Sequence, residues 1–225
     1  GIALALVVSL PLVAGVRFAG AHLDRFGVDP ALIPAARAWM APCAWSLVPS
    51  LVFMAVRQSL QALHDTRAAT VILLVANVVN AFFNAALIHG RYGLPAHGVA
   101  GSGEATVIAR AFTAVALLAW SAYRGPELRG VGWRLHGPTM RELLRLGVPA
   151  SVQLLFEGGV FSLVTVLCAR FGPTPAAAHQ VVLQIASFTF MVPLGIGAAG
   201  AVRVGNAIGR DDLRGARRAG WGAVV

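Results

Sequence analysis

The sequence predicts an all-α integral membrane protein, a polytopic bundle of transmembrane helices. Of its 225 residues, 57% are hydrophobic and only 12% are charged, and the mean hydropathy is +0.73. Soluble domains carry about 25% charged residues, so a chain this apolar is expected to have lipid as the solvent for much of its surface. Long apolar runs, separated by arginine-rich connections, divide the chain into spans.

Six runs come close to the roughly 20 apolar residues that a spanning helix needs. They are predicted at residues 1–17, 38–57, 68–88, 98–123, 144–169 and 176–202, and a seventh begins at Trp221. Proline and glycine occur within these runs, which membrane helices tolerate because neighbouring helices re-satisfy the backbone. Since the chain starts inside one run and ends at the start of another, we expect it to be part of a longer protein.

The basic residues predict the orientation of the chain in the membrane. The net charge is +9 and all 18 basic residues are arginines. They lie between apolar runs instead of forming one basic face, which excludes nucleic acid as the expected partner and favours a lipid bilayer. Twelve of them lie in the loops 57–67, 124–145 and 203–218. We therefore expect these loops to be cytoplasmic, in a multi-pass protein of the cell inner membrane.

The longest and most charged connection marks a boundary between two lobes. It predicts an N-lobe of helices at 1–123, a cytoplasmic inter-lobe linker at 124–143 and a C-lobe at 144–225.

Motifs of catalysis and of metal or nucleotide binding are missing from the sequence. Cys43 and Cys168 both lie in apolar runs and are interpreted as small packing residues. The sequence therefore predicts that the protein is not an enzyme and has no cofactor. A membrane-embedded enzyme using Glu157 and His179 is an alternative, which the lack of a paired nucleophile weakens.

Glu157 lies near the middle of the run at 144–169, where a carboxylate is costly and usually functional. Gln153 lies four residues earlier, on the same helical face. Gly158 and Gly159 follow directly and leave room for a neighbour or a substrate. A carboxylate at this depth can bind Na⁺ or a proton and can neutralise a cationic substrate. The alternative is a structural carboxyl group hydrogen-bonded to another helix.

A second group of polar residues lies in the runs 68–88 and 98–123. Asn77, Asn80 and Asn84 share one helical face, where they either join helices or line a polar cavity. Glu104 and Thr106 follow early in the next run. If the two helices pack together, Asn80, Asn84, Glu104 and Thr106 are expected to converge on one polar pocket in the outer half of the membrane.

The run at 176–202 begins with further polar residues. Gln180 and Gln184 share a face, and Met191 lies deeper in the run. Such residues usually pack against neighbours, but they are also candidates for lining a cavity that accepts aromatic cations.

Four stretches resemble the multidrug and toxic compound extrusion (MATE) family, nearest its NorM-like branch. They are RQSLQALHDTR at 57–67, NVVNAFFNAALIHGRYGLPAHGVAGSGEAT at 77–106, RLGVPASVQLLFE at 145–157 and AAAHQVVLQIASFTFMVPLGIGAAGAVRVGNAIGRDDLRGARRAG at 176–220. Their order and spacing agree with the family. The resemblance implies helices 3 to 8, with the start of helix 9, of a two-lobe transporter with twelve helices.

The resemblance also implies roles for particular residues. Glu157 matches a carboxylate used in cation coupling, which makes it the expected ligand if the ion is Na⁺. Asn80, Asn84 and Thr106 match an N-lobe site for a proton or cation, although Asn84 stands where some members have aspartate. Glu104 departs from the small or apolar residue of the family pattern, and whether it replaces a missing carboxylate is an open hypothesis.

The expected function is secondary active antiport, in which a Na⁺ or H⁺ gradient drives the export of drugs and organic cations by alternating access. Glu157 would carry the ion and Gln153 would orient it. The full-length chain is expected to work as a monomer. The alternative within the wider superfamily is a flippase for lipid-linked oligosaccharides, which the AHQ and RVGNAIG stretches argue against.

Overall fold

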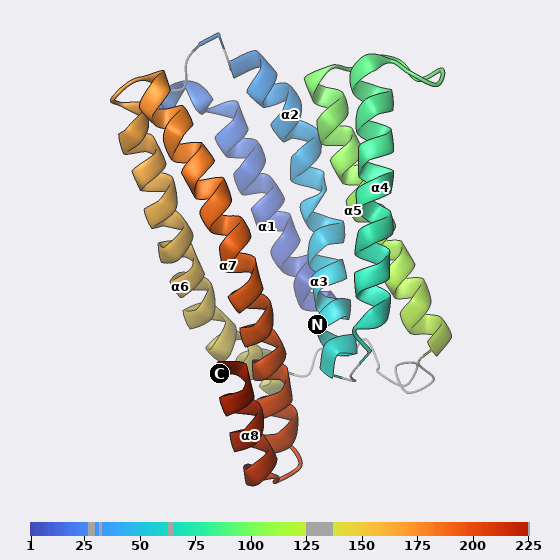
Figure 1. Cartoon of the computed structure of the whole chain (residues 1–225). Helices are drawn as coiled ribbons and strands as arrows, with labels where there is room; N and C mark the ends of the chain where they lie inside the picture. The colour runs from blue at the N-terminus through green and yellow to red at the C-terminus, as the bar shows by residue number, and fades with distance from the viewer. Residues whose placement is uncertain (27–29, 32, 63–64, 125–136, 225) are drawn as a thin grey trace. The chain divides into compact units, whose positions relative to one another are not determined.

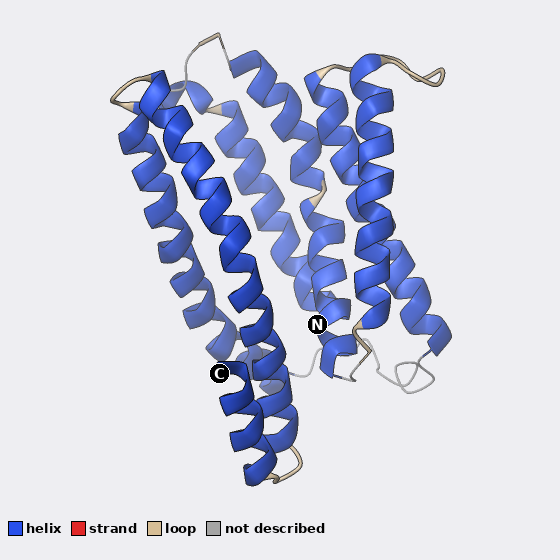
Figure 2. Cartoon of the chain, in the orientation of Figure 1, coloured by secondary structure: helices blue, strands red, loops and turns tan. Residues whose placement is uncertain are grey.

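The computed structural model describes residues 1–26, 30–31, 33–62, 65–124 and 137–224, and in these ranges all regular structure is helical (Figures 1 and 2). The α-helices are α1 (Ile2–Ala21), α2 (Ile33–Trp45), α3 (Leu47–Ala62), α4 (Arg67–His89), α5 (Val99–Arg124), α6 (Gly137–Ala169), α7 (Pro173–Ile208) and α8 (Leu213–Val224), and a 3₁₀ turn covers Leu23–Phe26. The predicted fold class is confirmed.

Five helices are each long and apolar enough to cross a membrane: α1, α4, α5, α6 and α7. A sixth span results if α2 and α3 are taken together as one bent segment. In the described part of the chain this number agrees with the six apolar runs seen in the sequence. The chain is a multi-pass membrane protein.

The second span is broken, and the prediction of one helix over 38–57 was wrong. α2 and α3 meet at Ser46 with a bend of 40°. Pro49 has no N–H to donate to the carbonyl of Trp45, so the regular helical ladder fails at this point. The Ser46 N–H instead bonds to the carbonyl of Cys43 at 3.0 Å, three residues back.

The segment 203–218 is helical except at residues 209–212, so its prediction as a loop was wrong. α7 continues to Ile208 and α8 begins at Leu213. Asp211 adopts a left-handed conformation with φ 57°, and the Asp212 carboxylate accepts a hydrogen bond of 2.8 Å from the Gly215 N–H. This is an N-terminal helix cap. Arginine has a high helix propensity, so an arginine-rich segment can be helical as well as exposed to water. Its charge alone therefore does not predict a loop.

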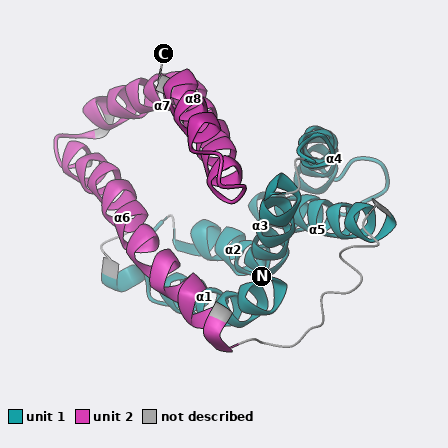
Figure 3. Ribbon diagram, turned by 90° about the horizontal axis from the view of Figure 1, so that it is seen from below, with its two compact units in different colours: residues 1–133 teal, residues 134–225 magenta. Residues whose placement is uncertain are grey.

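The chain separates into two compact units, residues 1–133 and 134–225 (Figure 3). The division falls inside the linker predicted at 124–143. Residues 125–136 of that linker lie outside the described part of the chain, and residues 137–143 form the first turns of α6.

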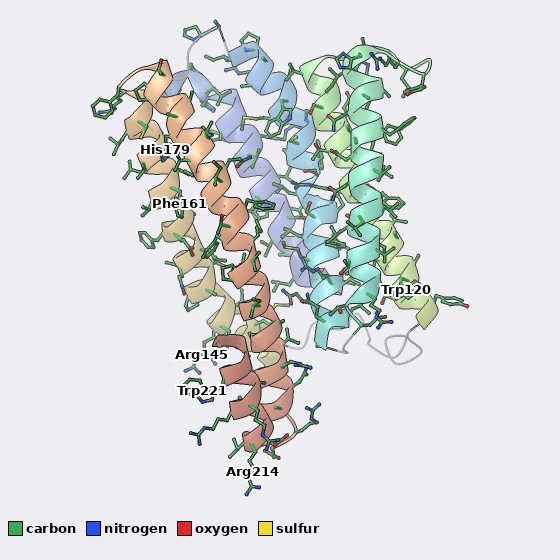
Figure 4. The ribbon with its side chains drawn as sticks, viewed as in Figure 1. Trp120, Arg145, Phe161, His179, Arg214 and Trp221 are labelled. Carbon is green, nitrogen blue, oxygen red and sulfur yellow. The ribbon has the colours of Figure 1, made fainter. Side chains whose placement is uncertain are left out.

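The first unit is centred on α5, which packs against α2, α3 and α4, while α1 packs against α2 and α3. Its hydrophobic core lies where α3, α4 and α5 meet. The buried residues of this core are Val52, Phe53, Val56, Leu60, Ala68, Ala69, Ala114 and Leu117. Beside it, the indole N–H of Trp120, near the end of α5 (Figure 4), donates a hydrogen bond of 3.1 Å to the Asp65 carboxylate in the α3–α4 turn.

Two glycines allow α5 to approach its neighbours closely. A Cβ atom added at Gly101 would lie 2.6 Å from the carbonyl oxygen of Leu87 on α4. A Cβ atom added at Gly103 would lie 2.6 Å from Cγ of Pro42 on α2. Both distances are far inside van der Waals contact, so these two positions set the spacing of three helices. Small residues at helix contacts are typical of membrane bundles.

The described residues of the second unit form three helices, with α7 packed against both α6 and α8 (Figure 1). In the most apolar 18-residue window of each of α6 and α7, no residue is buried within the described structure. Large side chains such as Phe156, Phe161 and Phe188 are 71%, 55% and 81% exposed. A surface so continuously apolar requires lipid or further helices to cover it.

Candidate functional site

The α6 carboxylate lies well inside its span. The span covers Met140–Cys168, and Glu157 is eleven residues from its end, or about 16 Å along the helix axis at 1.5 Å per residue. Its side chain is exposed. Cβ atoms added at Gly158 and Gly159 would meet nothing within 4 Å. Within the described ranges Glu157 has neither a hydrogen-bond partner nor an ion-pair partner, so its carboxylate is accessible to a ligand.

Gln153 lies one helical turn before Glu157 and is also exposed. The two side chains share a face, as expected. No hydrogen bond links them in the described structure, so the orienting role of Gln153 stays a prediction.

The asparagines of α4 interact along their own helix. The Asn84 amide donates to the backbone carbonyl of Asn80 at 2.9 Å and to the side-chain oxygen of Asn80 at 3.0 Å. Both residues are half-buried, whereas Asn77 is exposed. The Asn80 amide N–H₂ and the Asn84 side-chain oxygen stay available for a neighbour or a ligand. Neither the interhelical role nor the cavity-lining role is decided by these bonds.

Glu104 is paired with a residue that the sequence reasoning missed. His97, in the α4–α5 connection, lies 2.7 Å from the Glu104 carboxylate through Nδ1. The His97 N–H also bonds to the carbonyl of Leu87 at 2.8 Å, which holds the connection against the end of α4. The sequence feature that could have predicted this pair is the position of His97, seven residues before Glu104 and just outside the helix.

The pocket of Asn80, Asn84, Glu104 and Thr106 stays a prediction. α4 and α5 pack directly against each other, as that prediction required. The Thr106 hydroxyl donates to the carbonyl of Ser102 in its own helix at 2.9 Å. No recorded hydrogen bond among the described residues joins these four side chains across the two helices.

Arg110 projects from the middle of α5 toward the break between α2 and α3. One of its terminal nitrogens, Nη1, donates to the hydroxyl of Ser50 at 3.0 Å and to that of Ser46 at 3.3 Å. Sequence reasoning left Arg110 without a role and did not single out the serines. The two prolines on either side of Ser46 were the available signal of a break.

No hydrogen bond joins the polar side chains at the start of α7 to one another in the described structure. Gln180 and Gln184 are exposed, and Met191 is 63% exposed. His179 lies near the start of α7 (Figure 4), and its buried Nε2 atom has no hydrogen-bond partner among the described residues. Their role as a substrate surface stays a prediction.

Among the described residues, no three His, Cys, Asp or Glu side chains lie together where they could hold a metal ion. The role of Glu157 as a Na⁺ ligand stays a prediction.

Comparison with known proteins gives both a family and a set of relatives. The MatE family profile matches residues 1–86 and 149–224. A protein of Bradyrhizobium diazoefficiens called "Probable multidrug resistance protein NorM" is 39% identical over the whole chain, which covers 49% of that relative.

Proteins of the same name from Rhodopseudomonas palustris and Mesorhizobium japonicum are 38% and 36% identical, over 97% and 100% of this chain. The chain spans about half the length of these curated relatives. The resemblance found in the sequence is confirmed by the family match and by relatives that align along nearly the full chain. With its helical membrane fold and a profile match to both of its compact units, the chain belongs to the MatE family.

Proposed function

We propose that this chain forms part of a secondary active antiporter that exports drugs and organic cations and is driven by a Na⁺ or H⁺ gradient. The names of its relatives, multidrug resistance proteins, support drug efflux. MatE proteins are transporters and not enzymes, in agreement with the prediction from the sequence. The membrane-enzyme alternative based on Glu157 and His179 receives no support from these comparisons.

The observation that carries the proposal is the accessible carboxylate of Glu157 deep within the α6 span. A charge at this depth is costly unless it binds something. The candidates are a proton, a Na⁺ ion and the positive charge of a substrate, and a single carboxylate can hold only one of them well. Mutually exclusive binding of ion and drug is the requirement for exchange. Gln153 would orient the carboxylate from the same face.

Alternating access requires that each ligand bind the outward-facing and inward-facing states with different affinity. Na⁺ or a proton would neutralise Glu157 from the outside and release the drug there. Loss of the ion to the cytoplasm would restore the negative charge and favour binding of the next organic cation. Gln180, Gln184 and Met191 on α7, all accessible, would add polar and apolar contacts to an aromatic cation.

A second polar site is proposed in the first unit, formed by Asn77, Asn80 and Asn84 with Glu104 and Thr106. Its basis is the resemblance of Asn80, Asn84 and Thr106 to a family ion site, and the free donor and acceptor atoms of the asparagines. Glu104 would supply its only carboxylate, which His97 holds in position in the structure.

The test is efflux from membrane vesicles that contain the full-length transporter, meaning a protein that includes this chain and has the length of its curated relatives. Vesicles are loaded with ethidium or norfloxacin, and a Na⁺ gradient or a pH gradient is imposed separately. We expect efflux with one of the two gradients, which identifies the coupling ion. Empty-vector vesicles provide the background.

Absence of efflux with both gradients would contradict the proposal. The same vesicles would then be tested for translocation of a lipid-linked oligosaccharide, the activity of the flippase alternative.

We further propose that the segments 57–67, 124–145 and 203–218 face the cytoplasm of an inner-membrane protein. Cysteines placed singly at Asp211 and at Arg91, in a variant in which Cys43 and Cys168 are alanine, test this orientation. In intact cells a membrane-impermeant thiol reagent should label the cysteine at position 91 and leave the one at position 211 unlabelled. Labelling of position 211 in intact cells would contradict the orientation.

A further inference from the structure

Arg110 is a charged residue at the centre of a membrane span. The span in α5 covers Val99–Tyr123, and Arg110 is eleven residues from its start, about 16 Å along the helix axis. Arginine can extend its guanidinium several ångströms toward the membrane surface. Here the guanidinium is instead held sideways, against the α2–α3 break, by the hydroxyls of Ser46 and Ser50.

The two serines are arranged to receive a donor. The Ser46 hydroxyl donates its own hydrogen to the carbonyl of Cys43 at 2.7 Å, and the Ser50 hydroxyl donates to the carbonyl of Ser46 at 2.8 Å. With their hydrogens used, both oxygens present lone pairs, and Nη1 of Arg110 donates to both. Ser46 is 1% exposed, so one anchor of the guanidinium is fixed in the protein interior.

This arrangement orients the guanidinium but does not neutralise it. The described carboxylates of the first unit have other partners: Asp24 lies 3.5 Å from Arg37, Asp65 accepts from Trp120, and Glu104 pairs with His97. Hydroxyl groups supply no negative charge. No described carboxylate of the first unit therefore compensates Arg110, and its Nε and Nη2 donors are unused by the described residues.

The side chain is also accessible. Arg110 belongs to the exposed residues of the structure, although its neighbours Ala109 and Thr113 are buried. A charged group that faced lipid tails at this depth would be strongly destabilised. An arginine that is fixed, uncompensated and accessible is suited to a planar anion, since its fork of donors matches the two oxygens of a carboxylate.

We propose that Arg110, oriented by Ser46 and Ser50, binds the carboxylate of transported compounds that carry both a positive and a negative charge. This inference rests on the proposed drug-export function and assigns to it a residue that would discriminate among substrates. Arg110 would favour zwitterionic compounds over simple cations, because only the former supply the missing negative charge.

The experiment compares norfloxacin with its methyl ester, which lacks the negative charge and carries one additional methyl group. Equilibrium binding of each is measured on the purified full-length transporter. The unmodified protein should bind the acid more tightly than the ester. Charged hydrogen bonds of this kind correspond to a preference of about tenfold to a hundredfold.

The variant Arg110→Gln keeps donors for the two serines and removes the charge. It should weaken binding of norfloxacin by about tenfold or more and leave the ester and ethidium unchanged. Arg91→Gln, at an exposed arginine of the α4–α5 connection, is the matched control and should leave all three ligands unaffected. Unchanged ethidium binding also shows that the Arg110→Gln protein is folded.

Equal affinity of the unmodified protein for acid and ester would overturn the proposal without any variant, so the test does not depend on the folding of Arg110→Gln. An equal loss of acid and ester binding in Arg110→Gln would also overturn it, because that result would assign Arg110 to a pairing within the protein. In both cases ethidium efflux by the unmodified protein would still uphold the proposed transport function.

Discussion

Replacing Glu157 by glutamine is expected to reduce gradient-driven drug efflux to the level of empty vesicles. Glutamine keeps the size and hydrogen-bonding capacity of the side chain but can neither exchange a proton nor give Na⁺ an anionic ligand. The side chain is accessible and unpaired in the described structure, so the change breaks no internal contact. The measurement is ethidium and norfloxacin efflux from vesicles, normalised to the amount of transporter in the membrane.

Two further variants separate coupling from stability. Glu142→Gln removes a carboxylate near the start of the same helix, where Glu142 is exposed, and should keep normal efflux. Glu157→Asp keeps a carboxylate and should restore part of the activity. Normal efflux by Glu157→Gln would end the assignment of Glu157 to ion coupling and would leave it a structural residue of α6.

Placing alanine at both Gly101 and Gly103 is expected to destabilise the first unit severely. At Gly101 the new Cβ would lie 2.6 Å from the Leu87 carbonyl oxygen and 2.9 Å from the Leu87 Cβ. At Gly103 it would lie 2.6 Å from Cγ of Pro42 and 2.9 Å from the carbonyl oxygen of Trp39. α5 would then have to move away from two helices at once. Overpacking of this kind costs about 1–3 kcal/mol at each site.

The measurement is the thermal unfolding temperature of the full-length transporter in detergent, which should fall markedly in the double variant. Gly15→Ala is the matched control, because it lies in a helix of the same unit and a Cβ there would meet nothing within 4 Å. An unfolding temperature equal to that of Gly15→Ala would mean that α5 does not pack against α2 and α4 at these glycines.

From the sequence, the candidate site could be predicted only as a set of polar and charged side chains whose burial in a membrane span is energetically costly. Glu157 and the asparagines of α4 were singled out because a polar group at membrane depth is rarely accidental. Their neighbours were harder to foresee. Glu104 was considered with Asn80, Asn84 and Thr106, whereas the structure pairs it with His97 in a connecting loop. Arg110 had no evident partner until the α2–α3 break brought Ser46 and Ser50 to it.

Hydropathy determined the membrane class, the number of spans and their order. The free energy of transferring a segment from water into lipid depends mainly on the composition of that segment, and the sequence shows this composition directly. The motifs determined the family. The tertiary structure decided that the second span bends at Ser46, that helix continues through most of 203–218, and which side chain meets which. These features depend on missing backbone donors, on helix caps and on the rotation of packed helices about their axes. Partners far apart in the chain are brought together only when the helices that carry them pack.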